Sequence, residues 1–292
     1  MRPRQSSKPQ KTQVRTLPKF HFRSFEQQAM DAPPEVNRAA PGFGRKAVIY
    51  ATCFVNYNDP GIGHAARAVL AHNGVETEIV YPACCGMPKL EHGDLAAVAE
   101  SARTVSATLA PWLDRGYDVI ALTPSCALML KFEWPLILPD DAAVKRLAGA
   151  SFDIPEYVVN IAKKEGLAPG LGALDGGVTV HLACHARAQN MGPKAVEMLK
   201  LIPQADLGVI ERCSGHGGSW GVLKEFHGVA LKVGKPAART ALTQGKRYVT
   251  SECPLAARHL LEGMRELKPD AAVPARPYHP IELLAQAYGL YP

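Results

Sequence analysis

The chain is organised around Tyr81-Pro82-Ala83-Cys84-Cys85-Gly86-Met87-Pro88, in which two adjacent thiols follow an apolar, strand-like run. Successive side chains of a regular strand face opposite ways, so vicinal cysteines of a strand cannot reach one partner. A turn at Gly86 removes that restriction, because glycine adopts backbone angles closed to other residues. Both sulfurs can then bind one metal centre. The alternative is a pair of small buried hydrophobic side chains, as free cysteines often are.

The seven cysteines fall into an internal duplication. Three pairs recur at nearly constant offsets of 131, 129 and 127 residues, namely Cys53 with Cys184, Cys84 with Cys213, and Cys126 with Cys253. The seventh, Cys85, lies beside a duplicated position. The flanking segments also match: residues 75–81 resemble 205–211, and residues 119–126 resemble 247–253. Such an offset indicates two large repeated units rather than a solenoid.

Length and composition bound the class of protein. At 292 residues and 47% hydrophobic composition, the chain can bury a substantial core, and its length indicates two domains. The net charge of +6 is partly local, because residues 1–24 carry seven Lys or Arg side chains and no acid. We interpret this stretch as a solvated tail rather than a segment that binds nucleic acid or anionic lipid.

The sequence also bounds the compartment. No run approaches the roughly 20 apolar residues that cross a bilayer, and no secretory signal is recognisable. We therefore expect a cytoplasmic protein, with at most a peripheral association at the inner face of the membrane. In that compartment disulfides are rare, and clustered cysteines more often bind metal or perform redox chemistry.

Apolar runs alternate with helical segments, which predicts an α/β fold. In the first half we expect strands at 47–55, 76–81 and 117–123, helices at 65–72, 94–114 and 155–165, and an irregular linker at 130–141. In the second half we expect strands at 178–183, 207–211 and 248–250, and helices at 193–201, 219–245 (broken near Gly234), 254–265 and 280–288. This order implies two pseudo-repeated domains, each a parallel sheet with flanking helices. The expected boundaries are a disordered lead-in at 1–44, a first cysteine-rich domain at 45–170 and a second at 171–292.

The cysteines follow the predicted strands, at the edge where parallel sheets form their sites. Cys53, Cys84, Cys85 and Cys126 belong to the first half, and three separate strands deliver them. Four thiolates near one point suit either a tetrahedral Zn²⁺ ion or an iron–sulfur cluster. Structural zinc sites usually use short Cys-x-x-Cys motifs, and this sequence has none. The spacing of the cysteines therefore discriminates only weakly between zinc and an iron–sulfur cluster.

These motifs resemble a known family. The pattern of Cys53, Cys84-Cys85-Gly86-Met87-Pro88 and Ser125-Cys126, followed by Cys184, Cys213-Ser214-Gly215-His216-Gly217-Gly218 and Cys253-Pro254, is similar to the cysteine-rich "CCG" domain family. That family of iron–sulfur oxidoreductases includes the B subunit of heterodisulfide reductase and the C subunit of anaerobic glycerol-3-phosphate dehydrogenase. The resemblance covers the chain from about residue 45 onward.

The resemblance implies two tandem domains that bind one or two iron–sulfur clusters of the 4Fe–4S type, with zinc as the alternative cofactor. It implies ligand roles for all seven cysteines: Cys53, Cys84, Cys85, Cys126, Cys184, Cys213 and Cys253. The function implied is relay of electrons between a dehydrogenase-type partner and a quinone or a thiol/disulfide acceptor.

The sequence departs from the family pattern at three places. Met129 and Ala256 stand where the fullest motif ends in Cys-x-x-Cys, and Ser214 stands where a vicinal cysteine is expected. The second half therefore has three thiols, and we expect the fourth ligand there to be His216, His185, Ser214, a substrate or solvent. No ferredoxin-like segment with closely spaced cysteines is recognisable, so a separate dehydrogenase or ferredoxin-type protein is expected to supply electrons.

Several neighbouring residues receive structural interpretations. We expect His181 to be a hydrogen-bonded structural histidine, and residues 215–218 to let the backbone approach a cluster. Lys131, Trp134 and Trp220 are interpreted as packing or partner-facing residues. Two other functions stay open. One is a non-redox scaffold or binding subunit with structural or zinc-bound cysteines, and the other is thiol–disulfide chemistry at Cys84 and Cys85, which requires a depressed thiol pKa.

Overall fold

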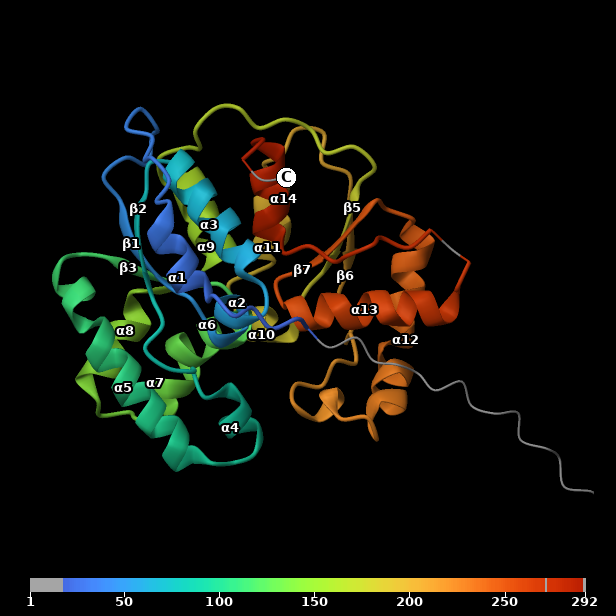
Figure 1. Cartoon of the computed structure of the whole chain (residues 1–292), viewed down its shortest axis with the longest axis horizontal. Helices are drawn as coiled ribbons and strands as arrows, with labels where there is room; N and C mark the ends of the chain where they lie inside the picture. Colours follow the sequence, from blue (N-terminus) through green and yellow to red (C-terminus); the bar gives the residue numbers. More distant parts are fainter. Residues whose placement is uncertain (1–17, 271, 291–292) are drawn as a thin grey trace, which may run out of the picture.

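The fold contains two parallel sheets, one in each half of the chain (Figure 1). The computed structural model describes residues 18–270 and 272–290. The first sheet has the order β2-β1-β3-β4, formed by β1 (Lys46–Tyr50), β2 (Glu76–Val80), β3 (Asp118–Ala121) and β4 (Ser151–Asp153). The second has the order β6-β5-β7, formed by β5 (Val178–His181), β6 (Leu207–Ile210) and β7 (Tyr248–Ser251). All pairings are parallel. The predicted α/β fold of two pseudo-repeated parallel sheets is therefore confirmed.

Helices connect the strands and cover the faces of the sheets. The first half contains α1 (Phe25–Asp31), α2 (Cys53–Tyr57), α3 (Pro60–His72), α4 (Met87–Glu91), α5 (Leu95–Asp114), α6 (Pro124–Leu128), a π-helical turn η1 (Met129–Glu133), α7 (Trp134–Ile137), α8 (Ala142–Gly149) and α9 (Ile154–Lys164). The second contains α10 (Cys184–Arg187), α11 (Lys194–Leu199), a 3₁₀ turn η2 (Trp220–Val222), α12 (His227–Gln244), α13 (Pro254–Leu267) and α14 (Pro280–Ala287). Within the described ranges, no helix is both long and apolar enough to cross a membrane.

The central strands β1 and β3 of the first sheet are buried on both faces, as expected for parallel strands between helices, whereas the edge strand β2 is partly exposed. Alternate residues of β1 enter different cores, because successive strand side chains point to opposite faces. Val48 and Tyr50 pack with residues of α5 and α8, whereas Ala47 and Ile49 pack into a central core that also holds Val180 of β5. The sequence of this strand is accordingly almost continuously apolar.

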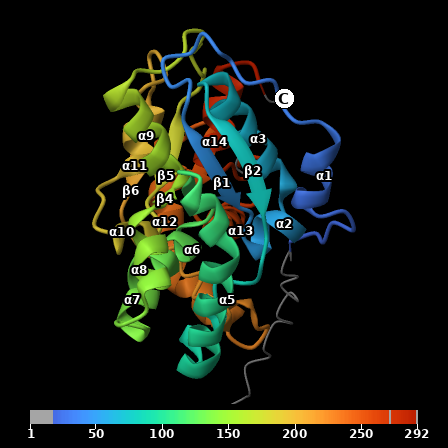
Figure 2. The same ribbon diagram turned by 90° about the vertical axis from the view of Figure 1, so that its left-hand side faces the viewer.

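The central core joins the two halves. The side chains of α3 and α9 meet those of α11 and α14 there, so these helices form one layer between the two sheets. In Figure 1, α14 of the second half lies beside α3 of the first, and Figure 2 shows the same pair from the side. Helices α12 and α13 cover the outer face of the second sheet, where Ile210 and Val249 pack. The two repeats therefore share a continuous apolar layer.

Two predicted segments differ from the structure near the cysteines. The strand expected at 47–55 ends at Tyr50, and a helix begins at Cys53. Thr52 lies between them with φ of 50°, a left-handed value that is strained for a β-branched residue. The prediction of an irregular linker at 130–141 is wrong, because this stretch is mostly helical. Pro135 is tolerated there because it stands in the first turn of α7.

Further differences concern short or interrupted elements. The expectation of a disordered lead-in at 1–44 is wrong for Phe25–Asp31, which is a helix with a Ser24 and Gln27 capping box and a fully buried Phe25. The five most N-terminal basic residues of that stretch lie outside the described residues. Strand β4 was not predicted. The helix expected at 219–245 begins only at His227 and continues unbroken past Gly234.

Candidate metal centre

The four cysteines of the first half gather beyond the carboxyl ends of β1, β2 and β3. Cys53 is the first residue of α2, Cys126 lies in the first turn of α6, and the vicinal pair stands in the loop between β2 and α4. Helix starts of this kind carry unpaired N–H groups and a partial positive charge, which favours thiolates nearby. The fold thus directs these thiols toward one place from three strands.

The four thiols form a row in which each contacts the next. Cys126 Sγ lies 3.3 Å from Cys85 Sγ, and the Cys84 thiol forms hydrogen bonds with those of Cys53 and Cys85. Within the described residues, however, no three of these sulfurs all lie within 4.8 Å of one another. The set is therefore an extended row of neighbouring thiols, not a compact tetrahedron.

The thiols differ in how easily they ionise. Hydrogen bonds from Cys53 and Cys85 hold the pKa of the Cys84 thiol well below its usual range, and the backbone N–H of Gly86 adds to this effect. The pKa of Cys53 is raised by its hydrogen bond to Cys84 and by burial, and the pKa of Cys85 by hydrogen bonds to Cys126 and Cys84. Cys84 therefore loses its proton more readily than Cys53 or Cys85, which gives the form that binds metals.

The loop that carries the vicinal pair is held by three contacts. Gly86 adopts a left-handed conformation with φ of 83°, and its N–H points at Cys84 Sγ from 3.5 Å. Trp134 Nε1 donates to the carbonyl oxygen of Cys85 at 3.1 Å, and Tyr50 Oη donates to that of Ala83 at 2.6 Å. The glycine was predicted from the sequence, whereas the roles of Trp134 and Tyr50 were not.

The second half repeats this arrangement with one thiol fewer. Cys184 begins α10, Cys253 directly precedes α13, and Cys213 follows β6. The N–H of Gly215 points at Cys213 Sγ from 3.3 Å, just as Gly86 does at Cys84. A side chain at Gly215 would meet the backbone nitrogen of Gly234 at 2.6 Å, so only glycine fits there.

The second set is more open than the first. Cys184 and Cys213 are exposed, whereas Cys85 and Cys126 are buried. Burial raises the pKa of Cys253 to about 11, and the nearby Cys184 thiol adds to that effect. The structure thus brings Cys184 and Cys253 into electrostatic range of each other, and Cys213 stands at the surface.

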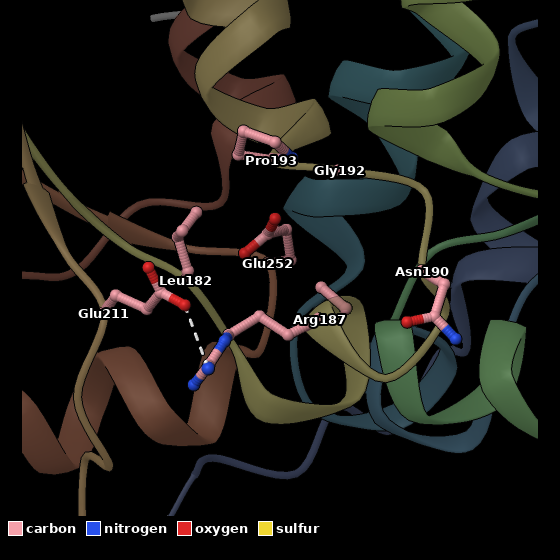
Figure 3. A pocket seen from close by; sticks show the side chains of 8 residues that line it. Leu182, Arg187, Asn190, Gly192, Pro193, Glu211 and Glu252 are labelled. Atoms are coloured by element: carbon pink, nitrogen blue, oxygen red, sulfur yellow. Dashed lines mark ion pairs between the residues drawn. The ribbon is translucent and has the colours of Figure 1, made fainter.

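A pocket of about 390 Å³ adjoins the second set (Figure 3). Its lining includes Leu182, Glu211 and Glu252, which directly follow β5, β6 and β7 respectively. Arg187 is paired with Glu211 at 2.9 Å, and Figure 3 shows this pair at the wall of the pocket. Burial raises the pKa of Glu252 to about 7, and the charge of Asp153 adds to the rise. The pocket therefore combines a guanidinium with carboxylates, on residues that lie close in sequence to the three cysteines.

The histidines near the second set take different roles. Nδ1 and Nε2 of His181 lie 3.0 Å from Ser251 Oγ and 2.9 Å from the Arg212 carbonyl oxygen, which confirms the structural interpretation of this residue. His185 lies near the carboxylates of Glu91 and Glu133, and burial lowers its pKa. His216 is buried in the loop after Cys213. Within the described part of the chain, neither His185 nor His216 is shown to lie within ligand distance of the cysteines.

The two sets of thiols face a common boundary between the halves. Ser219, in the loop after Cys213, donates its N–H and Oγ–H to Oε2 of Glu91 in α4, at 3.1 and 2.8 Å. Gln189 Nε2 donates to the carbonyl oxygen of Pro124 at 3.3 Å and to Asp153 Oδ2 at 3.0 Å. Helices α6 and α10 are in contact. The cysteine-bearing edges of the two sheets therefore adjoin.

Comparison with known proteins agrees with the duplication. The model of the cysteine-rich domain family CCG matches residues 47–131 and 178–260. The chain is 26% identical over 276 residues to the C subunit of anaerobic glycerol-3-phosphate dehydrogenase from Escherichia coli strain K12, covering 94% of this chain and 66% of that relative. It thus spans slightly under two thirds of that relative.

A second group of relatives is matched over a shorter stretch. The chain is 28% identical over 190 residues to lactate utilization protein A of Geobacillus thermodenitrificans, and 26% identical over 187 residues to the protein of the same name from Bacillus cereus strain G9842. Each match covers 61% of this chain and 74% of the relative. With both matched segments carrying the duplicated cysteines, the chain belongs to the cysteine-rich CCG domain family and contains two copies of its domain.

Proposed function

We propose that the chain is an iron–sulfur subunit that relays electrons between a dehydrogenase-type partner and a quinone or thiol/disulfide acceptor, at the cytoplasmic side. Cys53, Cys84, Cys85 and Cys126 would hold a cluster of the 4Fe–4S type. When bound, such a cluster supplies one-electron redox chemistry at a potential tuned by its surroundings. Residues 45–170 and 171–292 would be the two cysteine-rich domains.

The observation that carries this proposal is the spread of the first four thiols. A tetrahedral zinc ion with Zn–S bonds of about 2.3 Å holds all of its sulfurs about 3.8 Å apart. Here no three of the thiols, all of which lie in the described residues, are within 4.8 Å of one another, although neighbours in the row touch. A cluster binds each cysteine through a different metal atom and so suits a wider set. Among the described residues, the lack of three mutually close sulfurs therefore counts against a single zinc ion, and the gathering of four thiols in a CCG domain supports a cluster.

The surroundings also fit a redox centre. Gly86 N–H approaches Cys84 Sγ, and hydrogen bonds to ligand sulfurs tune cluster potentials. Two of the thiols, Cys85 and Cys126, are buried, which shields that part of the centre from solvent. The names of the relatives, one of them a dehydrogenase component and the other a lactate utilization protein, are consistent with work beside a dehydrogenase.

The second set of thiols is suited to pass electrons from the protein to an acceptor. Cys184 and Cys213 are exposed, and the pocket of about 390 Å³ is lined by residues close to them in sequence, including Arg187 and Glu211. We propose that Cys184, Cys213 and Cys253 hold a second centre that keeps one coordination position for substrate or solvent, with His185 and His216 as further candidate ligands. An acceptor in the pocket would then lie next to that centre.

One observation favours thiol–disulfide chemistry as a second candidate. The lowered pKa of Cys84 meets the condition for a reactive thiol. Alkylation separates the two functions. In protein that carries a cluster at the first set, Cys84 is expected to resist alkylation at neutral pH, and to react only after iron is removed.

Anaerobic electron paramagnetic resonance tests the proposal. Reduced wild-type protein is expected to show a cluster signal that disappears when a quinone is added. Cys126→Ser should abolish the signal of the buried centre. The matched variant Cys184→Ser should retain it, since that thiol belongs to the second set. A protein that binds zinc without labile sulfide, and shows no such signal, would instead be a non-redox scaffold.

A further inference from the structure

A second group of metal-binding side chains lies apart from the thiol sets, between α12 and α13. It consists of His227, the first residue of α12, and His259 and Glu262 of α13. One ligand atom from each of the three lies within 4.8 Å of the other two. Among the described residues, this is the sole set of three histidine, cysteine or carboxylate side chains that meets this criterion.

His259 occupies an unusual position for a histidine. Its side chain is 2% exposed, and within the described part of the chain neither of its ring nitrogens has a hydrogen-bond partner. A neutral imidazole carries one donor and one acceptor, and burying both without hydrogen bonds costs free energy. The ring lies edge-on to that of His227, with centroids 5.9 Å apart, and its Nδ1 is 3.6 Å from Glu262 Oε2.

We propose that His227, His259 and Glu262 bind one divalent transition-metal ion, Zn²⁺ in particular, through two imidazole nitrogens and one carboxylate oxygen. Such ligands bind zinc at about 2.0–2.2 Å, and a tetrahedral ion then holds them about 3.3–3.5 Å apart. The 3.6 Å between His259 Nδ1 and Glu262 Oε2 is close to that separation. A metal bond would also satisfy the lone pair of a His259 ring nitrogen that otherwise accepts no hydrogen bond.

The helices present these residues together for a simple reason. His259 and Glu262 are three residues apart and therefore share one face of α13. Helices α12 and α13 pack against each other, as Figure 1 shows, which brings the start of α12 onto that face. The set is thus fixed by helix packing, the kind of rigid support that a metal site needs.

A pocket lies one helical turn from the three ligands. This pocket of about 320 Å³ between the same helices is lined by Leu231, Gly263 and Glu266, among others. These three stand four residues after His227, His259 and Glu262, so they continue the same helix faces by one turn. The Glu262 side chain itself is 17% exposed. An ion would reach the buried histidines from this side.

A metal here would have a structural consequence for the thiol sites without depending on them. The chain runs from Cys213 through residues 214–226 directly into His227. An ion bound by His227 and by α13 would fasten the end of this loop to the helix that begins next to Cys253. The ion would keep a fourth position for water, since the chain supplies three ligands.

Zinc binding to the anaerobically purified full-length protein tests this inference. After equilibration with Zn²⁺ and removal of unbound ions, we expect one zinc ion per chain with nitrogen and oxygen ligands at about 2.0–2.1 Å in X-ray absorption spectra. Glu262→Gln and His259→Ala should each weaken the binding of this ion by about 100-fold or more, because even outer-shell changes cost up to about 100-fold. Iron and sulfide contents should not change in Glu262→Gln.

Controls keep this result separate from zinc bound by thiols. Glu266→Gln removes a carboxylate one turn further along α13 and should bind zinc like wild type. Zinc held by cysteines is recognised by sulfur ligands at about 2.3 Å. If His259→Ala fails to fold, Glu262→Gln decides the outcome alone. Zinc bound through sulfur only, or equal nitrogen- and oxygen-bound zinc in Glu262→Gln and wild type, would overturn the proposal.

Discussion

Cys85 Sγ and Cys126 Sγ lie 3.3 Å apart, although 41 residues separate them along the chain. They follow β2 and β3, which flank β1 in the sheet without touching each other. The vicinal pair and α6 therefore converge over the end of β1, where Cys53 begins α2. A site of this kind depends on the strand order, so it exists only once the whole first sheet has formed.

Trp134 is expected to stabilise the loop of the vicinal pair through its indole N–H. In Trp134→Phe the carbonyl oxygen of Cys85 loses its donor at a buried position, and such a loss costs about 1–3 kcal/mol. Urea unfolding measures this difference. Trp220→Phe, at a residue that is 41% exposed, should change stability by less than about 0.5 kcal/mol. Equal effects of the two substitutions would argue against this role.

Gly86 is expected to matter for both stability and metal retention. An alanine at its left-handed φ of 83° costs about 1–2 kcal/mol and disturbs the N–H bond to Cys84 Sγ. Gly93→Ala is the matched control, since Gly93 has φ of 77° and no neighbour within 4 Å of an added methyl group. Both variants should lose similar stability, but only Gly86→Ala should lose iron faster to a chelator. Identical iron release would contradict the link.

The raised pKa of Asp153 predicts that the stability of the protein depends on pH. Burial is the main cause that raises its pKa to about 7, and Gln189 donates to one of its oxygens. The folded protein therefore holds a proton that the unfolded chain releases near pH 4. The contribution of this proton to stability is complete below about pH 4 and is lost as pH rises to about 7.

The variant Asp153→Asn keeps the neutral form at every pH. Wild type loses this contribution between about pH 4 and about pH 7, whereas the variant does not. The free energy of unfolding of the variant minus that of wild type should therefore increase over this range, by up to about 4 kcal/mol, and then stay constant. Denaturant titrations across this range measure the difference. A difference that stays constant with pH would show that Asp153 ionises in the folded protein as it does in water.

Ser214→Cys is expected to complete the second set. Ser214 is buried directly after Cys213, at the position where the first half has Cys85. A thiol there should fill the open coordination position of the second centre, so that its iron is lost to a chelator more slowly than in wild type. Ser125→Cys, next to Cys126 in the first half, serves as the control and should leave the rate of iron loss unchanged. Equal rates of iron loss in Ser214→Cys and wild type would contradict a cluster at the second set.

Much of the fold could be predicted because buried parallel strands leave a clear apolar signal. The runs that became β1 and β3 are nearly continuous, and the offset of the cysteines revealed the duplication. Strand β4 was missed because its three residues are too short for a periodic signal. The helix α2 was missed because Cys53–Tyr57 continues the apolar run of β1, and only the unusual backbone of Thr52 separates them.

The sequence predicted which cysteines form the candidate site, but not which residues hold them in place. The order of strands and cysteines was sufficient to expect that Cys53, Cys84, Cys85 and Cys126 meet. Trp134 gave no such signal, since it lies 49 residues from Cys85 in the sequence and only the fold brings the two together. His227 and His259 are far apart in sequence, and only the packing of α12 on α13 brings them together.

Iron and acid-labile sulfide analysis of the anaerobically purified protein tests the central claim most directly. The account predicts iron and sulfide in about equal amounts, both strongly reduced in Cys126→Ser, which removes one of the two thiols in contact at 3.3 Å. Wild-type protein without sulfide, or a Cys126→Ser variant that retains the full content of both, would contradict it.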